Sequence, residues 1–135
     1  MSYLLDTNII SELRKKQPSK EVIDWISDIN SDELFISCLT IGEIKTGIIK
    51  LSSKDKVTSK ALDKWLNEIL QNYRENILNI DMETSLIWSE LMSIDNNNAI
   101  DGLIAAQAIN HRMTLVTRNM KHYNIYNIKL LNPFE

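Results

Sequence analysis

Three carboxylates in this sequence stand where short apolar runs give way to helical patterns. Asp6 directly follows an apolar run, Glu43 lies shortly after a second one, and Asp101 opens a helical pattern. Carboxylates brought close together repel one another unless a cation joins them. Mg²⁺ and Mn²⁺ favour such oxygen ligands and commonly share them with a substrate phosphate. These residue types therefore predict metal-assisted phosphate chemistry, in which a bound water is made acidic enough to attack phosphorus.

Each acid also has a purely structural explanation. Asp6 has the chemistry of an N-cap, because a short carboxylate accepts hydrogen bonds from the first amides of a helix. The segment Thr40–Glu43 matches a capping box. Asn98 is a candidate N-cap for a helix in which Asp101 complements the dipole. The placement of all three acids near helix starts at one presumed sheet edge favours a shared site over three independent caps.

Other polar side chains are expected at the same edge. Asn119 follows a predicted strand and offers an amide oxygen, which can orient a water but adds no negative charge. Thr7, Asn8 and Thr117 are candidates to fix the rotamers of the carboxylates, a role whose loss commonly costs 10–100-fold in metal affinity or activity, as a rough guide. Arg118 is a candidate phosphate contact, although a solvent-exposed arginine is the simpler alternative.

The elements that position these residues are expected to alternate between strand and helix. Five short apolar runs predict strands at Tyr3–Leu5, Leu34–Ile36, Ile77–Ile80, Thr114–Val116 and Ile128–Leu131. Apolar residues at helical spacing separate them, around 22–29, 41–51, 61–73, 86–94 and 103–109. This alternation predicts the α/β class, with a mostly parallel sheet of about five strands flanked by helices in an α/β/α arrangement. Ligands bind such sheets beyond the carboxyl ends of the strands.

Composition limits the remaining choices. The chain has 135 residues, 44% of them hydrophobic, and a formal net charge of −3, so a single globular domain over 1–135 is expected. Its one cysteine, Cys38, allows no intrachain disulfide, and no signal peptide or membrane span is expected, which together favour the cytoplasm. No nucleophile elbow, P-loop or dinucleotide fingerprint is present, so serine hydrolases, P-loop enzymes and dinucleotide oxidoreductases are disfavoured.

Positive charge is local rather than general. Arg14, Lys15 and Lys16 follow the predicted helix after Asp6, and a lysine-rich stretch runs from Lys45 to position 64. Phosphate contacts from such residues would position a nucleic acid without reading its sequence. Taken alone, the lysine stretch is better explained as a solvated helix face.

Four segments in order, and the end of the chain, resemble the PIN-domain endoribonucleases of the VapC/FitB toxin type. The segments are LLDTNIISE at 4–12, SCLTIGEIKTG at 37–47, DGLIAAQA at 101–108, LVTRN at 115–119 and NPF at 132–134. The resemblance implies a PIN-like domain that binds Mg²⁺ or Mn²⁺ and hydrolyses RNA phosphodiesters, with tRNA among the candidate targets. It further implies a cognate antitoxin and a homodimer.

The resemblance also assigns residues. Asp6, Glu43 and Asp101 match the three family acids that bind metal. Asn119 matches a fourth catalytic position that is often acidic, and His122 stands where an acid is frequently found. A second metal is therefore expected to be weakly held or recruited with the substrate.

Two other functions compete with this interpretation. Asp6 after an apolar strand could be the nucleophile of an aspartyl phosphatase, but Asn8 stands where that chemistry needs a second aspartate. A non-catalytic PIN-like module that binds RNA or a protein is the stronger rival, because Asn119 removes a charge from the site. Trapping of a phosphoenzyme would favour the first, and chelator-insensitive RNA binding without cleavage the second.

Overall fold

The central element of the fold is a five-stranded parallel sheet. The computed structural model describes residues 1–135, and the strand order is β3-β2-β1-β4-β5 with every neighbouring pair parallel. The strands are β1 (Tyr3–Leu5), β2 (Leu34–Ser37), β3 (Ile77–Leu78), β4 (Thr114–Val116) and β5 (Leu130–Leu131). The five predicted strands are confirmed, and the sheet is parallel throughout. The edge strands β3 and β5 are shorter than predicted, since an edge strand pairs on one side only.

Helices connect the strands as the periodicity predicts. They are α1 (Thr7–Leu13), α2 (Lys20–Ser27), α3 (Cys38–Ser52), α4 (Lys56–Asn72), α5 (Met82–Ile94), α6 (Ala99–Asn110) and α7 (Met120–Tyr123), with short 3₁₀ turns at Ser31–Glu33, Arg74–Asn76 and Asn124–Tyr126. The four-residue helix α7 has no counterpart among the sequence predictions. The helices include no apolar stretch of the length and hydrophobicity that a membrane span needs.

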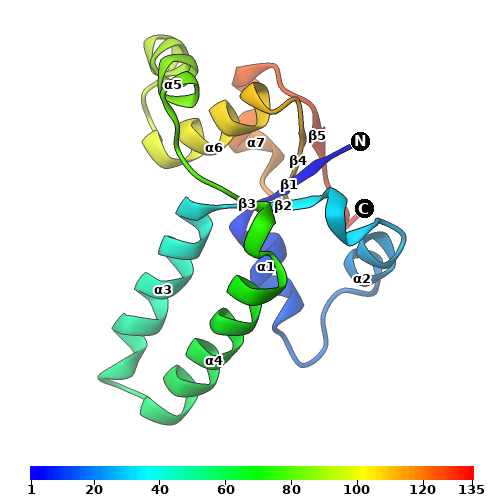
Figure 1. The fold of residues 1–135 in the computed structure, drawn as a ribbon, viewed down its shortest axis with the longest axis vertical. Coiled ribbons are helices and arrows are strands. Elements are labelled where there is room, and N and C mark those ends of the chain that lie inside the picture. Colours follow the sequence, from blue (N-terminus) through cyan, green and yellow to red (C-terminus); the bar gives the residue numbers. More distant parts are fainter.

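Two hydrophobic cores lie on opposite faces of the sheet. Successive strand residues point to opposite faces, so Leu4 joins one core and Leu5 the other. The first core includes Ile104 of α6 and Tyr123 of α7, and the second includes Ile9 of α1. Figure 1 shows the resulting layers, with α5, α6 and α7 on one side of the sheet. The α/β/α expectation is therefore confirmed.

Two pairs of helices pack closely around this frame. In Figure 1, α3 and α4 lie side by side as a hairpin that extends away from the sheet. On the other side, α6 packs against α5, where a Cβ atom added at Gly102 would collide with the side chain of Met92 and lie 3.3 Å from Trp88 Cδ1. A larger residue next to Asp101 would therefore need the end of the Met92 side chain to move and would crowd Trp88.

Candidate active site

Asp6 is the most buried of the three predicted acids, with only 6% of its surface exposed. It directly follows β1, where its amide donates to the carbonyl of Val116 in β4. It is also the N-cap of α1, and its Oδ1 accepts from the amide of Thr7 at 2.8 Å. The N-cap interpretation is thus confirmed. The second oxygen, Oδ2, accepts from the Thr117 hydroxyl at 2.8 Å and from Asn8 Nδ2 at 3.3 Å, so a single carboxylate is held from three directions.

Burial raises the pKa of Asp6 above its ordinary value of 3.8. Desolvation is the largest cause, and the nearby negative charge of Asp101 adds to it. Hydrogen bonds from Thr117, Thr7 and Tyr123 oppose the shift because they stabilise the ionised form. Keeping Asp6 ionised at this buried position therefore lowers the stability of the folded protein.

Asp101 approaches Asp6 from the first turn of α6. The side chain of Asn98 caps this helix by accepting from the Asp101 amide at 3.1 Å, as predicted. The Asp101 carboxylate is 18% exposed, and its Oδ2 lies 3.3 Å from Nδ1 of His122. Its Oδ1 accepts from the Tyr123 hydroxyl at 3.1 Å. The side chain of Asp101 therefore faces α7 and, through Tyr123, Asp6.

Glu43 lies inside α3 and does not cap it. The helix begins at Cys38, and the hydroxyl of Ser37 caps it by accepting from the amide of Leu39 at 3.1 Å. The capping-box interpretation of Thr40–Glu43 is wrong, because the helix starts three residues earlier than that motif requires. The exposed Glu43 instead accepts a hydrogen bond from the Thr7 hydroxyl at 2.9 Å, which reaches across from α1.

The three carboxylates are linked through hydroxyl groups. Tyr123 contacts both Asp6 and Asp101, and Thr7 follows Asp6 and contacts Glu43. No three His, Cys, Asp or Glu side chains of the chain come close enough together to form a ready-made metal cluster. The carboxylate donors are oxygen atoms only, and no Lys or Arg side chain forms a salt bridge with Asp6 or Asp101. This donor set fits a hard divalent cation such as Mg²⁺ or Mn²⁺.

The predicted supporting side chains lie around Asp6. Asn8 Nδ2 contacts both Asp6 and the Thr117 hydroxyl, while Asn8 Oδ1 accepts from the amide of Arg118 at 3.1 Å. Asn119 donates its amide to the Thr117 hydroxyl at 3.0 Å, and its exposed side chain makes no hydrogen bond. The loop after β4 is thereby tied to the turn after β1.

Replacing Thr117 with valine is expected to weaken both the fold and the site. The fully buried hydroxyl donates to Asp6 and accepts from two groups, so its loss should lower the free energy of unfolding by about 1–3 kcal/mol. Any activity that depends on Asp6 should fall roughly 10–100-fold. Urea unfolding and RNA cleavage measure the two effects. Thr114→Val is the matched control, because the hydroxyl of this buried residue makes no hydrogen bond, and equal effects in both variants would contradict the expectation.

The predicted basic residues fall into two groups. Lys15 pairs with Glu12 at 2.8 Å, Lys45 pairs with Asp63 at 2.6 Å, and the guanidinium of Arg118 lies 4.5 Å from the centre of the Phe134 ring. Arg14 and Lys16 are exposed and form no salt bridge. These two residues therefore keep their charge available for an external anion.

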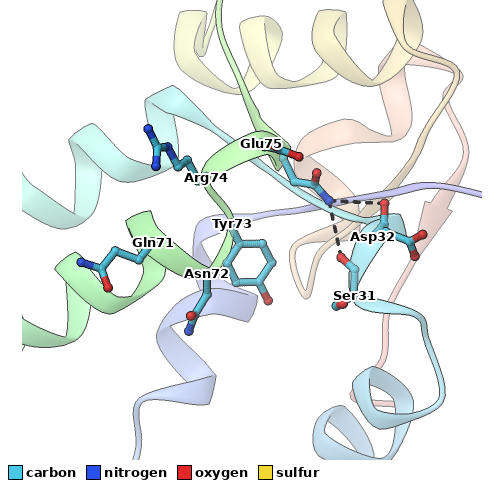
Figure 2. A pocket seen from close by; sticks show the side chains of 8 residues that line it. Ser31, Asp32, Gln71, Asn72, Tyr73, Arg74 and Glu75 are labelled. Carbon is cyan, nitrogen blue, oxygen red and sulfur yellow. Dashed lines mark hydrogen bonds between the residues drawn. The ribbon is translucent and has the colours of Figure 1, made fainter.

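Pockets flank the candidate site on both sides. A pocket of about 310 Å³ lies beside Glu43, with Thr7, Arg14 and Trp65 in its wall. Another of about 460 Å³ lies beside Asp101 and His122. A pocket of about 500 Å³ elsewhere holds none of the predicted residues. Figure 2 shows this pocket, which is lined by Ser31, Asp32 and residues 71–76, and these segments directly precede β2 and β3.

Tyr123 is the site residue that the sequence analysis missed. Its side chain is fully buried, and its hydroxyl lies 3.3 Å from Asp6 Oδ2 and 3.1 Å from Asp101 Oδ1. Burial, together with the negative charges of the two aspartates, raises the pKa of Tyr123, so the hydroxyl keeps its proton. The only sequence signal was its position four residues after Asn119, in a segment without helical periodicity.

Fold and site together define an α/β/α domain with acidic residues at the carboxyl ends of its central parallel strands. Residues 3–128 match the family described as PIN domain. The chain belongs to the PIN-domain family.

Several proteins are similar to this chain over nearly its whole length. Toxin FitB of Neisseria gonorrhoeae is 29% identical, with 97% of each protein covered. The VapC ribonuclease Y4jK of Sinorhizobium fredii is 28% identical, covering 98% of this chain and 97% of the relative. The crystal structure of FitAcB from Neisseria gonorrhoeae matches with a TM-score of 0.90 at 28% identity, over 98% of this chain and 99% of that one. A toxin–antitoxin complex from Klebsiella pneumoniae matches with a TM-score of 0.76 at 25% identity, over 99% of both chains.

Proposed function

We propose that this protein is a metal-dependent endoribonuclease that acts in the cytoplasm as the toxin of a toxin–antitoxin pair. One observation carries the proposal. In a member of the PIN-domain family, Asp6 and Asp101 lie together at the carboxyl edge of the sheet, where both contact the hydroxyl of Tyr123. The relatives named as a ribonuclease and as a toxin support the same activity.

Asp6, Asp101 and Glu43 are the residues that would hold Mg²⁺ or Mn²⁺. When bound, such a cation neutralises charge on the phosphate and makes a water molecule more acidic. Thr7, Asn8 and Thr117 orient the carboxylates through the hydrogen bonds described above. Asn119 carries an unpaired amide at the same edge, which can orient a water molecule or the substrate.

RNA would reach these acids only with help from positive charge, since the acids repel phosphate. Arg14 lies in the wall of the pocket beside Glu43, and its guanidinium has no carboxylate partner. Lys16 is exposed two residues further along the chain. Arg118 follows β4 and lies beside Asn119, and Lys45 can exchange the surface carboxylate of Asp63 for phosphate at small cost. Lys15 is exposed but pairs with the buried Glu12, so its amine would contact phosphate while it keeps that partner. These contacts position RNA, with tRNA among the candidate substrates.

A cognate antitoxin and a second copy of the chain are the proposed protein partners. The antitoxin is supported by the structural likeness to FitAcB and to the toxin–antitoxin complex from Klebsiella pneumoniae. The homodimer rests on the family resemblance, and light scattering of the purified protein would test it.

The decisive experiment is cleavage of a mixed RNA panel, including tRNAs, with Mg²⁺ or Mn²⁺. The wild-type protein is compared with Asp6→Ala and with a chelator control. Discrete cleavage that disappears in both controls supports the proposal. RNA binding that survives the chelator, without cleavage, would instead favour a non-catalytic PIN-like binding module.

Replacing Asn119 with aspartate is expected to tighten Mn²⁺ binding by about tenfold. The Asn119 side chain is exposed and makes no hydrogen bond, so the added charge should not disturb the fold. Calorimetry measures the affinity, and Asn124→Asp, on the exposed surface nearby, adds the same charge as a control. Unchanged or weaker binding by Asn119→Asp would remove this residue from the site.

A further inference from the structure

The hydroxyl of Tyr123 is the one group that contacts both Asp6 and Asp101. We propose that Tyr123 is a positioning residue, whose hydroxyl sets where the Asp101 carboxylate lies relative to Asp6. The consequence for RNA cleavage rests on the proposed function, whereas the geometric role does not.

Packing fixes the place of this hydroxyl. Tyr123 ends the four-residue helix α7, yet its side chain is fully buried in the core that also holds Leu4, Ile104 and Leu115. A buried aromatic ring has little freedom to rotate away from its neighbours. The packing of the ring in the core therefore holds the oxygen at its tip in place.

The number of hydrogen bonds that each carboxylate accepts shows which of the two depends on Tyr123 for its position. A phenol has one proton to donate. Asp6 Oδ2 already accepts from Thr117 and Asn8, while Asp101 Oδ1 accepts from Tyr123 alone. The shorter of the two contacts is also the one to Asp101, at 3.1 Å against 3.3 Å. The Tyr123 hydroxyl therefore donates its proton to a hydrogen bond with Asp101. The Asp6 carboxylate would keep its position without the Tyr123 hydroxyl.

Only one other side chain holds the Asp101 carboxylate. His122 approaches Oδ2 at 3.3 Å, but its side chain is 55% exposed. An exposed contact of this kind is weakened by water and salt. Without the Tyr123 hydroxyl, repulsion from Asp6 should turn the Asp101 carboxylate away. A packing role alone would be filled by phenylalanine, which would avoid burying a polar oxygen.

Tyr123→Phe tests this role, because it keeps the ring and removes only the hydroxyl. Tyr73→Phe is the matched control: Tyr73 is a partly buried tyrosine packed against the other core, and its hydroxyl makes no hydrogen bond. Both variants and the wild type are crystallised without metal, titrated with Mn²⁺ by calorimetry, and assayed for RNA cleavage.

In Tyr123→Phe we expect the Asp101 carboxylate to move by about 1 Å or more, enough to lower kcat by 10–100-fold with the KM for RNA unchanged. Mn²⁺ affinity should fall by about tenfold, a quantity that a loss of packing alone would not move. Tyr73→Phe should match the wild type in every measurement.

An Asp101 carboxylate that stays in place in Tyr123→Phe, or Mn²⁺ affinity within about twofold of a metal-binding wild type, overturns the proposal. If the wild type itself binds no Mn²⁺ and cleaves no RNA, the proposed function fails. The crystal structure of Tyr123→Phe then decides the positioning role by itself.

Discussion

Asp6→Asn should lower RNA cleavage by about a thousandfold while leaving the protein folded. Asparagine keeps the size of the side chain and an oxygen that can accept from the Thr7 amide, so the N-cap of α1 survives. It removes the negative charge that the proposed cation requires, and it places an amide where Thr117 and Asn8 now donate. Activity and stability should therefore separate at this residue.

The stability difference between Asp6→Asn and the wild type should depend on pH. The pKa of Asp6 is raised in the folded protein above its ordinary value of 3.8, so the folded state binds the proton more tightly than the unfolded state. The contribution of Asp6 to stability is complete below the unfolded pKa and is lost as the pH rises through the folded pKa. Asparagine cannot ionise. The Tm of Asp6→Asn relative to the wild type should accordingly increase between acidic and neutral pH.

Thermal unfolding of both proteins across this pH range, without metal, measures the effect. Asp28→Asn is the control, since Asp28 is exposed at the end of α2 and lies outside the site. A Tm difference for Asp6→Asn that stays flat with pH would show that burial does not penalise the charge of Asp6. Cleavage at the wild-type rate would remove this carboxylate from the active site.

The fold was predictable because its signals are local. Each strand is a short apolar run between helical patterns, and a chain with that alternation has few arrangements other than a covered parallel sheet. Asp6 could be placed at the sheet edge for the same reason, since it directly follows a strand. The sequence predicts Asp101 at the same edge of the sheet, but how closely it approaches Asp6 depends on the strand order, in which β4 lies next to β1.

Tyr123 escaped prediction for a physical reason. Its contacts join residues 117 and 22 positions apart, so they depend on tertiary structure that no local pattern encodes. The helix that carries it has only four residues, fewer than a periodic pattern needs. For Glu43 a local pattern misled the prediction. The segment matches a capping box, but the helix begins earlier, at Cys38, so Glu43 lies inside the helix.

Glu43→Gln should lower RNA cleavage by about a hundredfold or more without changing the stability of the protein. The Glu43 side chain is exposed within α3 and caps no helix end, and its one hydrogen bond is accepted from the Thr7 hydroxyl. Glutamine keeps that acceptor and has nearly the same helix propensity. The free energy of unfolding should therefore stay within about 0.5 kcal/mol of the wild type, as for an ordinary surface substitution.

Glu68→Gln provides the matched control, because Glu68 is an exposed glutamate of α4 that forms no salt bridge. Cleavage assays, Mn²⁺ calorimetry and urea unfolding on the three proteins separate the alternatives. Weakened Mn²⁺ binding together with lost cleavage would place Glu43 with Asp6 and Asp101, although in the metal-free chain it reaches them only through Thr7. If Glu43→Gln cleaves RNA at the wild-type rate, the acidic site consists of Asp6 and Asp101 without Glu43. If the variant also has a lower free energy of unfolding, the role of Glu43 is structural.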